Sequence, residues 1–374
     1  MKKVLVLGCT GSIGSSTLDI IRNEKDFVVC GLTANSSKEN LSRLSSEFNC
    51  PSLLFSEIKG DIKAELSSFI QKTRPDIVVN GIAGSAGLIP SIAVLENGID
   101  LALANKESVV MAGPIIFDLA KKNGCKILPV DSEHSAIFTL LNQCGRENVD
   151  KLIITASGGP FRTWTSDKIK TATLQDALKH PTWNMGTKIT VDSATLGNKG
   201  LEVIEAKRLF GFSTENIQVV VHPQSIVHSL VRTKDGIVYG QLSEPDMKHP
   251  IISALTFPEI KKDHMKPFDL TDFSDSNETV RTLTFEKPRT DDFPLLGLAF
   301  EAAKIDGFAP IAFNAANEIA AWAFIDGKIT FPKISETVEF ALKSRDWATE
   351  VRDIEDVFEA DREARYTAKT FLKE

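Results

Sequence analysis

Residues 4–14 read VLVLGCTGSIG, and this short segment determines how the first third of the chain is expected to fold. Val4–Leu7 predicts a short buried strand, and three glycines spaced by three residues follow at once. A glycine-rich turn between a strand and a helix can bend tightly and direct backbone N–H groups towards a pyrophosphate. We therefore expect a dinucleotide at this turn, to which Thr10 and Ser12 add hydroxyl groups. The alternative is a tight strand–helix turn without a ligand.

The first third of the chain continues this strand–helix pattern. Short apolar runs alternate with amphipathic stretches, which is typical of a doubly wound (Rossmann-type) parallel sheet in an α/β protein. We place this nucleotide-binding domain at residues 1–130. The expected strands are Val4–Leu7, Phe27–Leu32, Ile77–Asn80, Leu101–Ala104 and Ile127–Val130.

The remainder of the chain has a different composition. We expect a second α/β domain at residues 131–262. Within it, residues 157–187 form a long segment rich in Gly, Pro, Thr and Lys, and a segment of this kind is usually a functional lid. Residues 263–290 have the composition of a linker, and helical patterns over 291–374 predict a C-terminal four-helix bundle.

Composition narrows the possible partners. The chain has 374 residues, of which 42% are hydrophobic and 25% charged, so it is long enough for more than one folded domain. Lys plus Arg number 43 against 50 for Asp plus Glu, and this negative balance opposes nucleic-acid binding. Local donors must therefore hold any phosphate group, which favours a small phosphorylated ligand.

The cysteine pattern and the N-terminus bear on the compartment. The five cysteines are widely spaced and contain no C-x-x-C pair, which fits neither a disulfide framework nor a zinc knuckle. No apolar run reaches the ~18 residues that a membrane span needs. The first expected strand begins at once, which leaves no room for a targeting peptide. We predict a cytoplasmic protein without a membrane partner.

The loop after the second expected strand bears on cofactor choice. NAD enzymes normally place an acidic residue there to bind the ribose 2′-hydroxyl. This chain has Asn35, Ser36, Ser37 and Lys38 instead, and donors of this kind suit a 2′-phosphate, so we predict NADP rather than NAD. The alternative is an ordinary helix N-cap, for which Ser37 is suited.

Acidic residues follow the last strand of the first domain. In an extended chain, residues two apart face the same side, so Asp131 and Glu133 are expected to converge. Glu202, in a helix expected over residues 200–210, is a candidate third ligand. Oxygen ligands suit Mg²⁺ or Mn²⁺ rather than zinc. Solvated acidic residues at a strand end are the alternative.

Two further segments contain many hydrogen-bond donors. Residues 157–159 and 192–200 offer hydroxyl, amide and ammonium groups that a phosphate monoester needs, although plain loops have similar compositions. Residues 105–107 follow an expected strand at the carboxyl edge of the sheet, where doubly wound folds bind ligands. Among four histidines that could act as acid–base groups, namely His134, His180, His222 and His228, we prefer His180 because it lies in the expected lid.

Several unusual motifs occur in order along nearly the whole chain. They resemble those of the 1-deoxy-D-xylulose 5-phosphate reductoisomerase family. The motifs are GCTGSIG (8–14), ANKES (104–108), DSEHS (131–135), SGGPF (157–161), HPTWNMG (180–186), the stretch from DSAT (192–195) to Glu202, and HPQS (222–225).

The resemblance implies a homodimeric enzyme of the non-mevalonate isoprenoid route, in which residues 131–262 form a connective and catalytic domain that bears the lid and the dimer surface. Such an enzyme uses NADPH and Mn²⁺ or Mg²⁺ to convert 1-deoxy-D-xylulose 5-phosphate to 2-C-methyl-D-erythritol 4-phosphate, by a metal-assisted rearrangement followed by hydride transfer. The implied metal ligands are Asp131, Glu133 and Glu202. The implied substrate residues are Lys106, Ser132, Glu133 and Glu202 around the ketose, and Ser157, Ser193, Asn198 and Lys199 at its phosphate, with His180 beside them.

The resemblance also implies the cofactor and catalytic residues. Lys106, Glu133, His180 and Glu202 are expected to be catalytic. Cofactor contacts are expected at Thr10, Gly11, Ser12, Ile13, Asn105, Glu107 and Gly186. Trp183 and Met185 are expected to close over the site and exclude water; the alternative for Trp183 is a core aromatic.

One position departs from the family pattern. Many members carry a basic residue where this chain has Ser36, which weakens the expectation of NADPH over NADH; Lys38 is a candidate substitute.

A rival interpretation is a plain NAD(P)-dependent dehydrogenase of a phosphorylated aldehyde or hydroxy acid, which would not require a divalent metal. A second rival is a cofactor-sensing binding protein, which would have no turnover.

Overall fold

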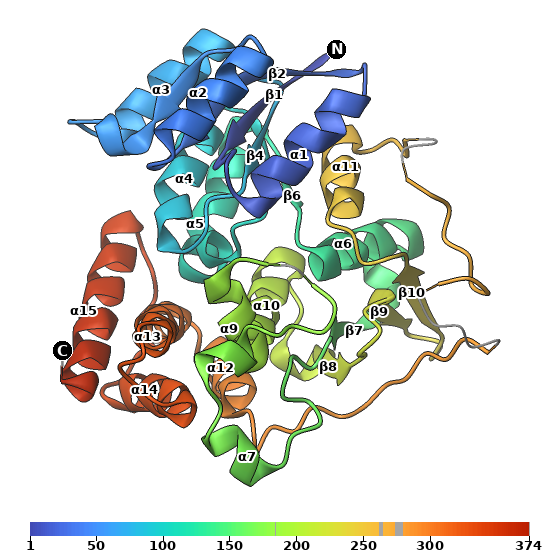
Figure 1. Cartoon of the computed structure of the whole chain (residues 1–374), viewed down its shortest axis with the longest axis vertical. Helices are drawn as coiled ribbons and strands as arrows, with labels where there is room; N and C mark the ends of the chain where they lie inside the picture. The colour runs from blue at the N-terminus through green and yellow to red at the C-terminus, as the bar shows by residue number, and fades with distance from the viewer. Residues whose placement is uncertain (184, 262–264, 274–279, 374) are drawn as a thin grey trace. The chain divides into compact units, whose positions relative to one another are not determined.

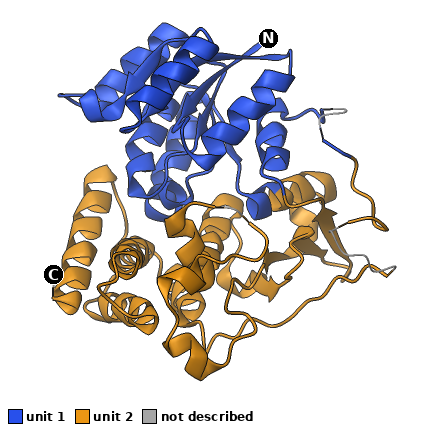
Figure 2. Cartoon of the chain, in the orientation of Figure 1, with its two compact units in different colours: residues 1–135, 246–266 blue, residues 136–245, 267–374 orange. Residues whose placement is uncertain are grey.

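The computed structural model describes residues 1–183, 185–261, 265–273 and 280–373. The chain forms two compact units (Figure 2). Unit 1 contains residues 1–135 and 246–266, and unit 2 contains residues 136–245 and 267–374. Among the described helices, none is both long enough and apolar enough to span a bilayer.

Unit 1 is built around a six-stranded parallel sheet. The strand order is β3-β2-β1-β4-β5-β6, the order found in dinucleotide-binding folds, which confirms the predicted fold class. The short strand β3 was not predicted, because it has only three residues and its place depends on pairing with β2. The strands are β1 (Lys2–Leu7), β2 (Phe27–Ala34), β3 (Ser52–Leu54), β4 (Ile77–Asn80), β5 (Asp100–Leu103) and β6 (Ile127–Pro129).

Helices connect these strands, and one further helix joins them from later in the chain. The helix α11 (Lys248–Thr256) packs against α1, and Figure 1 shows the two side by side. Lys248 forms an ion pair with Asp19, and Lys261 pairs with Glu24 at 3.1 Å. Residues 246–261, which we assigned to the second domain from sequence, therefore pack with unit 1. The other helices are α1 (Ser12–Asn23), α2 (Lys38–Glu47), α3 (Ile62–Thr73), α4 (Leu88–Glu96) and α5 (Lys106–Asn123).

The turn between β1 and α1 requires glycine at two positions. Gly8 has a φ of +75°, a conformation that other residues rarely adopt. A Cβ atom at Gly14 would lie 2.5 Å from the Cα atom of Cys9, so no larger residue fits. The first turn of α1 consequently lies directly against the turn, with its N-terminus at the carboxyl end of β1.

Unit 2 contains a mixed four-stranded sheet. The strand order is β10-β9-β7-β8; β8 runs parallel to β7, and β9 is antiparallel to both β7 and β10. The strands are β7 (Val149–Ala156), β8 (Ile217–Val221), β9 (Val227–Thr233) and β10 (Val238–Leu242). The helices in this part of the chain are α6 (Ser132–Cys144), α7 (Ser166–Lys170), α8 (Leu174–Ala177), α9 (Thr187–Ala194) and α10 (Gly197–Phe210). The first residues of α6 belong to unit 1.

Four C-terminal helices complete unit 2, close to the predicted ranges. The first of them packs tightly on α10, because a Cβ atom at Gly200 would lie 2.7 Å from the Cβ atom of Ala299. The second contacts both α9 and α10. These helices therefore share a core with the segment that holds Ser193 and Glu202. They are α12 (Pro294–Ile305), α13 (Ala309–Ile325), α14 (Phe331–Lys343) and α15 (Ile354–Leu372).

The predicted linker is only partly described. Residues 263, 264 and 274–279 lie outside the described residues. Farther along, the backbone of Glu286 pairs with Val221 at the end of β8, with N–O distances of 2.9 and 2.8 Å. This part of the segment therefore packs against the sheet, which its polar composition did not indicate. The predicted division into three domains stays a prediction.

Candidate active site

The residues around the expected cofactor lie in two turns of unit 1. Thr10 and Gly11 lie in the turn after β1, and α1 begins at Ser12 without a side-chain cap. Ser37 occupies the N-cap position of α2 but makes no capping hydrogen bond. Lys38, the candidate substitute for a basic residue, pairs at the surface with Glu57 at 2.7 Å. Its ammonium group must therefore leave this partner before it can bind a 2′-phosphate.

Asn105 connects the start of α5 to the loop after β4. Its Oδ1 atom accepts a hydrogen bond from the backbone N–H of Ser108 at 2.9 Å, which caps the helix. Its amide group donates to the carbonyl oxygens of Ile82 and Gly84, both at 2.8 Å, and contacts Glu107 at 2.9 Å. Asn105 therefore shapes this loop, and its predicted direct contact with the cofactor stays a prediction.

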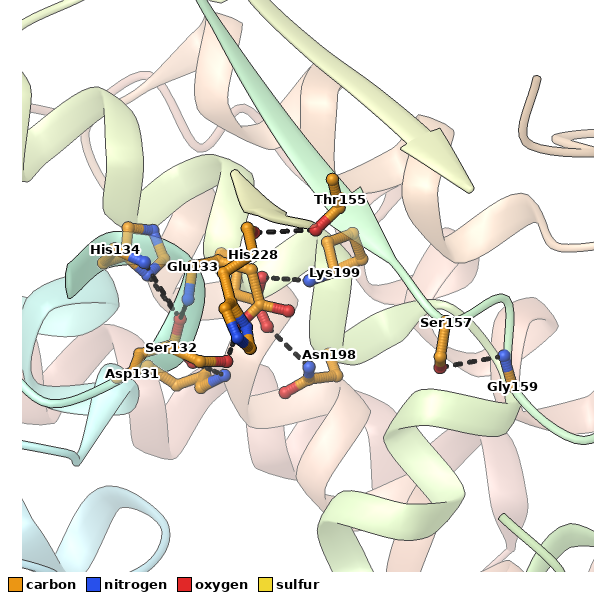
Figure 3. Close-up of polar contacts among 12 residues, drawn as sticks. Asp131, Ser132, Glu133, His134, Thr155, Ser157, Gly159, Asn198, Lys199 and His228 are labelled. Atoms are coloured by element: carbon orange, nitrogen blue, oxygen red, sulfur yellow. Dashed lines mark hydrogen bonds and ion pairs between the residues drawn. The ribbon is translucent and has the colours of Figure 1, made fainter. Parts of the chain in front are cut away.

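Asp131 begins α6 instead of extending β6. Its Oδ1 atom accepts hydrogen bonds from the backbone N–H groups of Glu133 at 3.0 Å and His134 at 3.2 Å (Figure 3). The extended geometry that we expected for residues 131–133 is wrong, because aspartate is a strong helix N-cap and Asp131 directly precedes α6. The Nζ atom of Lys106 lies 2.9 Å from Oδ2 of the same carboxylate.

Glu133 lies in the first turn of α6. The hydroxyl group of Ser132 donates to its Oε2 atom at 2.6 Å. Negative charge is stabilised at a helix N-terminus by the helix dipole, so α6 favours ionised Asp131 and Glu133. Unit 1 therefore brings together four predicted site residues: Lys106, Asp131, Ser132 and Glu133.

The third predicted metal ligand lies on α10 in unit 2. Glu202 is 1% exposed, and it accepts a hydrogen bond from the Asn198 amide at 2.6 Å and pairs with Lys199. These residues lie three and four positions apart, so they share one face of the helix. The helix begins at Gly197, three residues earlier than expected, after Leu196 with a φ of +57°. A buried carboxylate with two donors is held in one orientation.

His180 and Ser157 form a hydrogen-bonded pair in unit 2. The Nδ1 atom of His180 accepts the backbone N–H groups of Thr182 at 3.1 Å and Trp183 at 2.8 Å, so the ring hydrogen must be on Nε2. Nε2 therefore donates to Ser157 Oγ, 3.0 Å away. Burial lowers the pKa of His180 to about 4. A neutral ring in this arrangement orients the Ser157 hydroxyl. The acid–base role of His180 stays a prediction.

The loop that carries Ser157 packs against α9. Gly159 has a φ of +66°, and a Cβ atom there would lie 2.7 Å from the carbonyl oxygen of Ser193. Ser157 Oγ also accepts the N–H of Gly159 at 3.3 Å. Two residues predicted for the phosphate site, Ser157 and Ser193, are thus in adjacent segments. The helix α9 itself was not predicted, because Thr187–Ala194 contains several β-branched residues.

The described part of residues 157–187, the predicted lid, contains both helical and irregular stretches, and its role as a lid stays a prediction. Its first part contains α7 and α8, and the fully buried ring of Phe161 packs on Trp164 at a centroid distance of 4.7 Å. Residues 179–183, 185 and 186 form no helix or strand. Trp183 is only partly buried, and its ring lies 6.5 Å from that of His228. Trp183 is therefore not a fully enclosed core residue.

The other histidines have structural hydrogen bonds. Nδ1 of His134 lies 3.0 Å from Asp131, and Nδ1 of His222 donates to the carbonyl oxygen of Thr284 at 2.9 Å. Burial also lowers the pKa of His222. His228 differs from these two because its ring faces Trp183, and its Nε2 atom contacts Ser243 at 2.8 Å. No local sequence signal distinguished His228, since its position depends on the pairing of β7 and β9.

Family models match most of the chain. The model for 1-deoxy-D-xylulose 5-phosphate reductoisomerase matches residues 4–63 and 56–113. The model for its C-terminal domain matches residues 127–210, and a model described as the DXP reductoisomerase C-terminal domain matches residues 242–367.

Individual relatives match over the full length. The 1-deoxy-D-xylulose 5-phosphate reductoisomerase of Treponema denticola is 48% identical over 98% of this chain and 96% of its own length. That of Chlorobaculum tepidum is 44% identical over 100% of both chains. The crystal structure of the Zymomonas mobilis reductoisomerase in complex with NADPH is 39% identical, with a TM-score of 0.88 over 100% of this chain and 99% of its own. A structure of DOX-P reductoisomerase with NADPH, fosmidomycin and magnesium is 37% identical, with a TM-score of 0.86 over 100% and 98%.

Proposed function

The chain belongs to the 1-deoxy-D-xylulose 5-phosphate reductoisomerase family, and we propose that it converts 1-deoxy-D-xylulose 5-phosphate to 2-C-methyl-D-erythritol 4-phosphate. It is an NADPH-dependent oxidoreductase of isoprenoid precursor synthesis. The observation that carries this function is the full-length identity of 44 to 48% with reductoisomerases, together with related structures that contain NADPH and magnesium.

We assign the divalent metal, Mn²⁺ or Mg²⁺, to Asp131, Glu133 and Glu202. Three carboxylates offer an all-oxygen donor set, which fits these cations. Each carboxylate is already oriented by hydrogen-bond donors of its own helix. When bound, the cation supplies a Lewis acid that polarises the ketose carbonyl and eases deprotonation of a neighbouring hydroxyl.

We assign the substrate phosphate to Ser157, Ser193, Asn198 and Lys199. Ser157 accepts two hydrogen bonds, from His180 and Gly159, so its own O–H can donate to a phosphate oxygen. Lys199 is 4% exposed, which concentrates its charge in a region of low dielectric constant. His180 fixes the Ser157 hydroxyl in this arrangement. Lys106 and Ser132 are assigned to the ketose end.

We assign NADPH to the turn between β1 and α1. Gly14 has no Cβ, so the first turn of α1 packs directly against the backbone of Gly8 and Cys9, and the N-terminus of α1 follows the turn where we place the pyrophosphate. We assign Thr10, Gly11, Ser12 and Ile13 to contacts with this part of the cofactor. Asn35, Ser36 and Ser37 are assigned to the 2′-phosphate, and Asn105, Glu107 and Gly186 to the remainder of the cofactor. The bound cofactor supplies the hydride that reduces the rearranged aldehyde.

We assign the exclusion of water to Trp183 and Met185. Both lie in the irregular stretch before α9, and Trp183 is anchored through its backbone N–H on His180. We expect this stretch to close over the ligand, whereas the core around Phe161 stays packed.

We further propose a cytoplasmic homodimer. The edge strand β10 and the turn before it expose Ile237, Val238 and Tyr239, each more than 40% accessible, and an apolar sheet edge of this kind favours pairing with a second copy. The five cysteines are free thiols, which fits a reducing compartment. Light scattering at micromolar concentration tests the dimer, and Val238→Lys should shift it towards monomer.

One assay tests the activity. Purified protein is mixed with 1-deoxy-D-xylulose 5-phosphate and NADPH, with and without Mn²⁺, and reduced nicotinamide is followed by absorbance while the product is identified by mass and NMR. Metal-dependent formation of the branched polyol phosphate is the expected result. Turnover without Mn²⁺ in excess chelator would favour the plain dehydrogenase, and binding of NADPH without turnover would favour a sensor.

A further inference from the structure

Asp192 is a buried carboxylate next to Ser193 on α9. It is 2% exposed and lies within unit 2. Its Oδ2 atom lies 2.6 Å from the ammonium of Lys188, one helical turn earlier. Its Oδ1 atom accepts a hydrogen bond of 3.0 Å from the amide of Asn317. Asn317 lies on α13, so a C-terminal helix supplies one of the donors of this carboxylate.

The backbone of Asp192 also supports the turn that leads into α10. Its carbonyl oxygen accepts the hydroxyl of Thr195 at 3.0 Å, and the same hydroxyl oxygen accepts the N–H of Gly197 at 3.1 Å. Leu196 lies between Thr195 and Gly197 and has a φ of +57°, a backbone conformation that a bulky residue rarely adopts unless the surrounding structure holds it there. The turn therefore depends on a fixed position of Asp192.

We propose that Asn317 is a positioning residue for the substrate phosphate. It holds the Asp192 carboxylate, and Asp192 in turn sets the position of Ser193 and of the turn before Asn198. This inference rests on the proposed function, since it takes Ser193 and Asn198 as phosphate ligands. The C-terminal helices then contribute to substrate affinity as well as to stability.

The physical basis is the cost of a buried carboxylate without its donor. A buried charged group that loses a hydrogen bond must find a replacement, either by movement of its helix or by admission of water. Movement of the helix and admission of water each displace α9, and Ser193 moves with it. Neither affects the cofactor turn after β1, which lies in unit 1.

The test compares two nearly isosteric variants of one helix. Asn317→Leu removes the donor to Asp192, whereas Asn314→Leu changes the same residue type one turn earlier. Asn314 is fully buried, and neither of its amide atoms has a hydrogen-bond partner among the described residues. We expect Asn317→Leu to raise KM for 1-deoxy-D-xylulose 5-phosphate about fivefold, on the scale of coupling carried through one packed contact. KM for NADPH and kcat per active site should stay within about twofold.

Inorganic phosphate provides a second readout, as a competitive inhibitor of the same site. Its inhibition constant should rise with KM in Asn317→Leu and stay near the wild-type value in Asn314→Leu. Thermal unfolding and titration of active sites with NADPH measure stability in the same samples. A lower Tm or active fraction with unchanged KM and unchanged phosphate inhibition would overturn the positioning role. If Asn317→Leu does not accumulate as folded protein, Asn317→Ala tests the same bond.

Ser193→Ala separates this inference from the proposed function. If Ser193→Ala raises KM and Asn317→Leu does not, only the positioning role is overturned. If Ser193→Ala leaves KM and phosphate inhibition unchanged, the phosphate site itself is wrong and the role of Asn317 fails with it. If Ser193→Ala abolishes NADPH binding instead, the assignment of unit 2 residues to the phosphate is wrong.

Discussion

The Nε2 atom of His180 lies 3.0 Å from the Oγ atom of Ser157. The other ring nitrogen already accepts two backbone N–H groups, so the neutral ring must donate towards the serine. This relationship gives the histidine a defined tautomer and the serine a defined hydroxyl direction. It also makes the protonation state of the pair testable.

His180 should make folding stability depend on pH in a known direction. Burial lowers the pKa of its imidazole from 6.5 to about 4 in the folded protein. As pH falls from 6.5 towards 4, the unfolded chain binds a proton that the folded protein does not, so stability should decline through this window. Urea unfolding at pH 7 and pH 5 should show a smaller decline in His180→Gln than in wild type. An equal decline in both proteins would contradict the neutral buried state.

Glu202→Gln should reduce metal-dependent turnover by at least ~100-fold, the scale for loss of a central electrostatic group. The amide keeps the shape of the side chain but loses the charge that a dication needs. Mn²⁺ affinity from calorimetry should fall in parallel, while NADPH affinity should not change. The exposed Glu215 provides a control, since Glu215→Gln should retain wild-type kinetics. Wild-type activity in Glu202→Gln would refute the metal assignment.

Trp183→Ala should raise KM for the ketose and lower kcat, each by roughly tenfold, with cofactor affinity near normal. The indole lies in the irregular stretch before α9, where closure would exclude water. Trp164→Phe is the matched control, because Trp164 lies in the packed part of the same segment against Phe161. Its kinetics should be close to wild type even if its Tm falls. Unchanged kinetics in Trp183→Ala would rule out the lid.

Gly14→Ala should lower the free energy of unfolding by about 1 to 3 kcal/mol and abolish tight NADPH binding. Its Cβ atom would lie 2.5 Å from the backbone of Cys9, so the helix and the turn must separate. Gly297→Ala offers the opposite case, because nothing lies within 4 Å of its Cβ position in α12. That change should stabilise the helix by about 0.5 to 1 kcal/mol. Equal Tm shifts in the two variants would contradict this account.

The fold was predictable where patterns are local. The buried runs of β1 and β4 and the glycine-rich turn identified the parallel sheet, and the 3.6-residue periodicity located α12 to α15. The short strand β3 was not predictable in this way, since its place depends on pairing with β2. The helix α11 was not predicted either, because its position in unit 1 follows from tertiary contacts with α1.

For the candidate site, the sequence predicted the types of residue better than it predicted their geometry. Oxygen ligands and phosphate donors follow from the motifs, but residues 131–133 form a helix start where we expected extended chain. The rule that residues two apart face the same side holds only for an extended chain, so it could not predict that Asp131 caps a helix. The neutral state of His180 was also not predictable, because it depends on burial and on two backbone N–H groups from residues 182 and 183.

The helix α11 has a consequence for how the protein is made. Unit 1 takes up residues 246–266, yet the entire second sheet, which ends at Leu242, is translated before them. On the ribosome, the nucleotide-binding unit must wait for residue 256 before its last helix can cover α1. A fragment that stops at residue 135 lacks the partner of Asp19, so an isolated cofactor-binding fragment will need α11 fused back to it by a short connector.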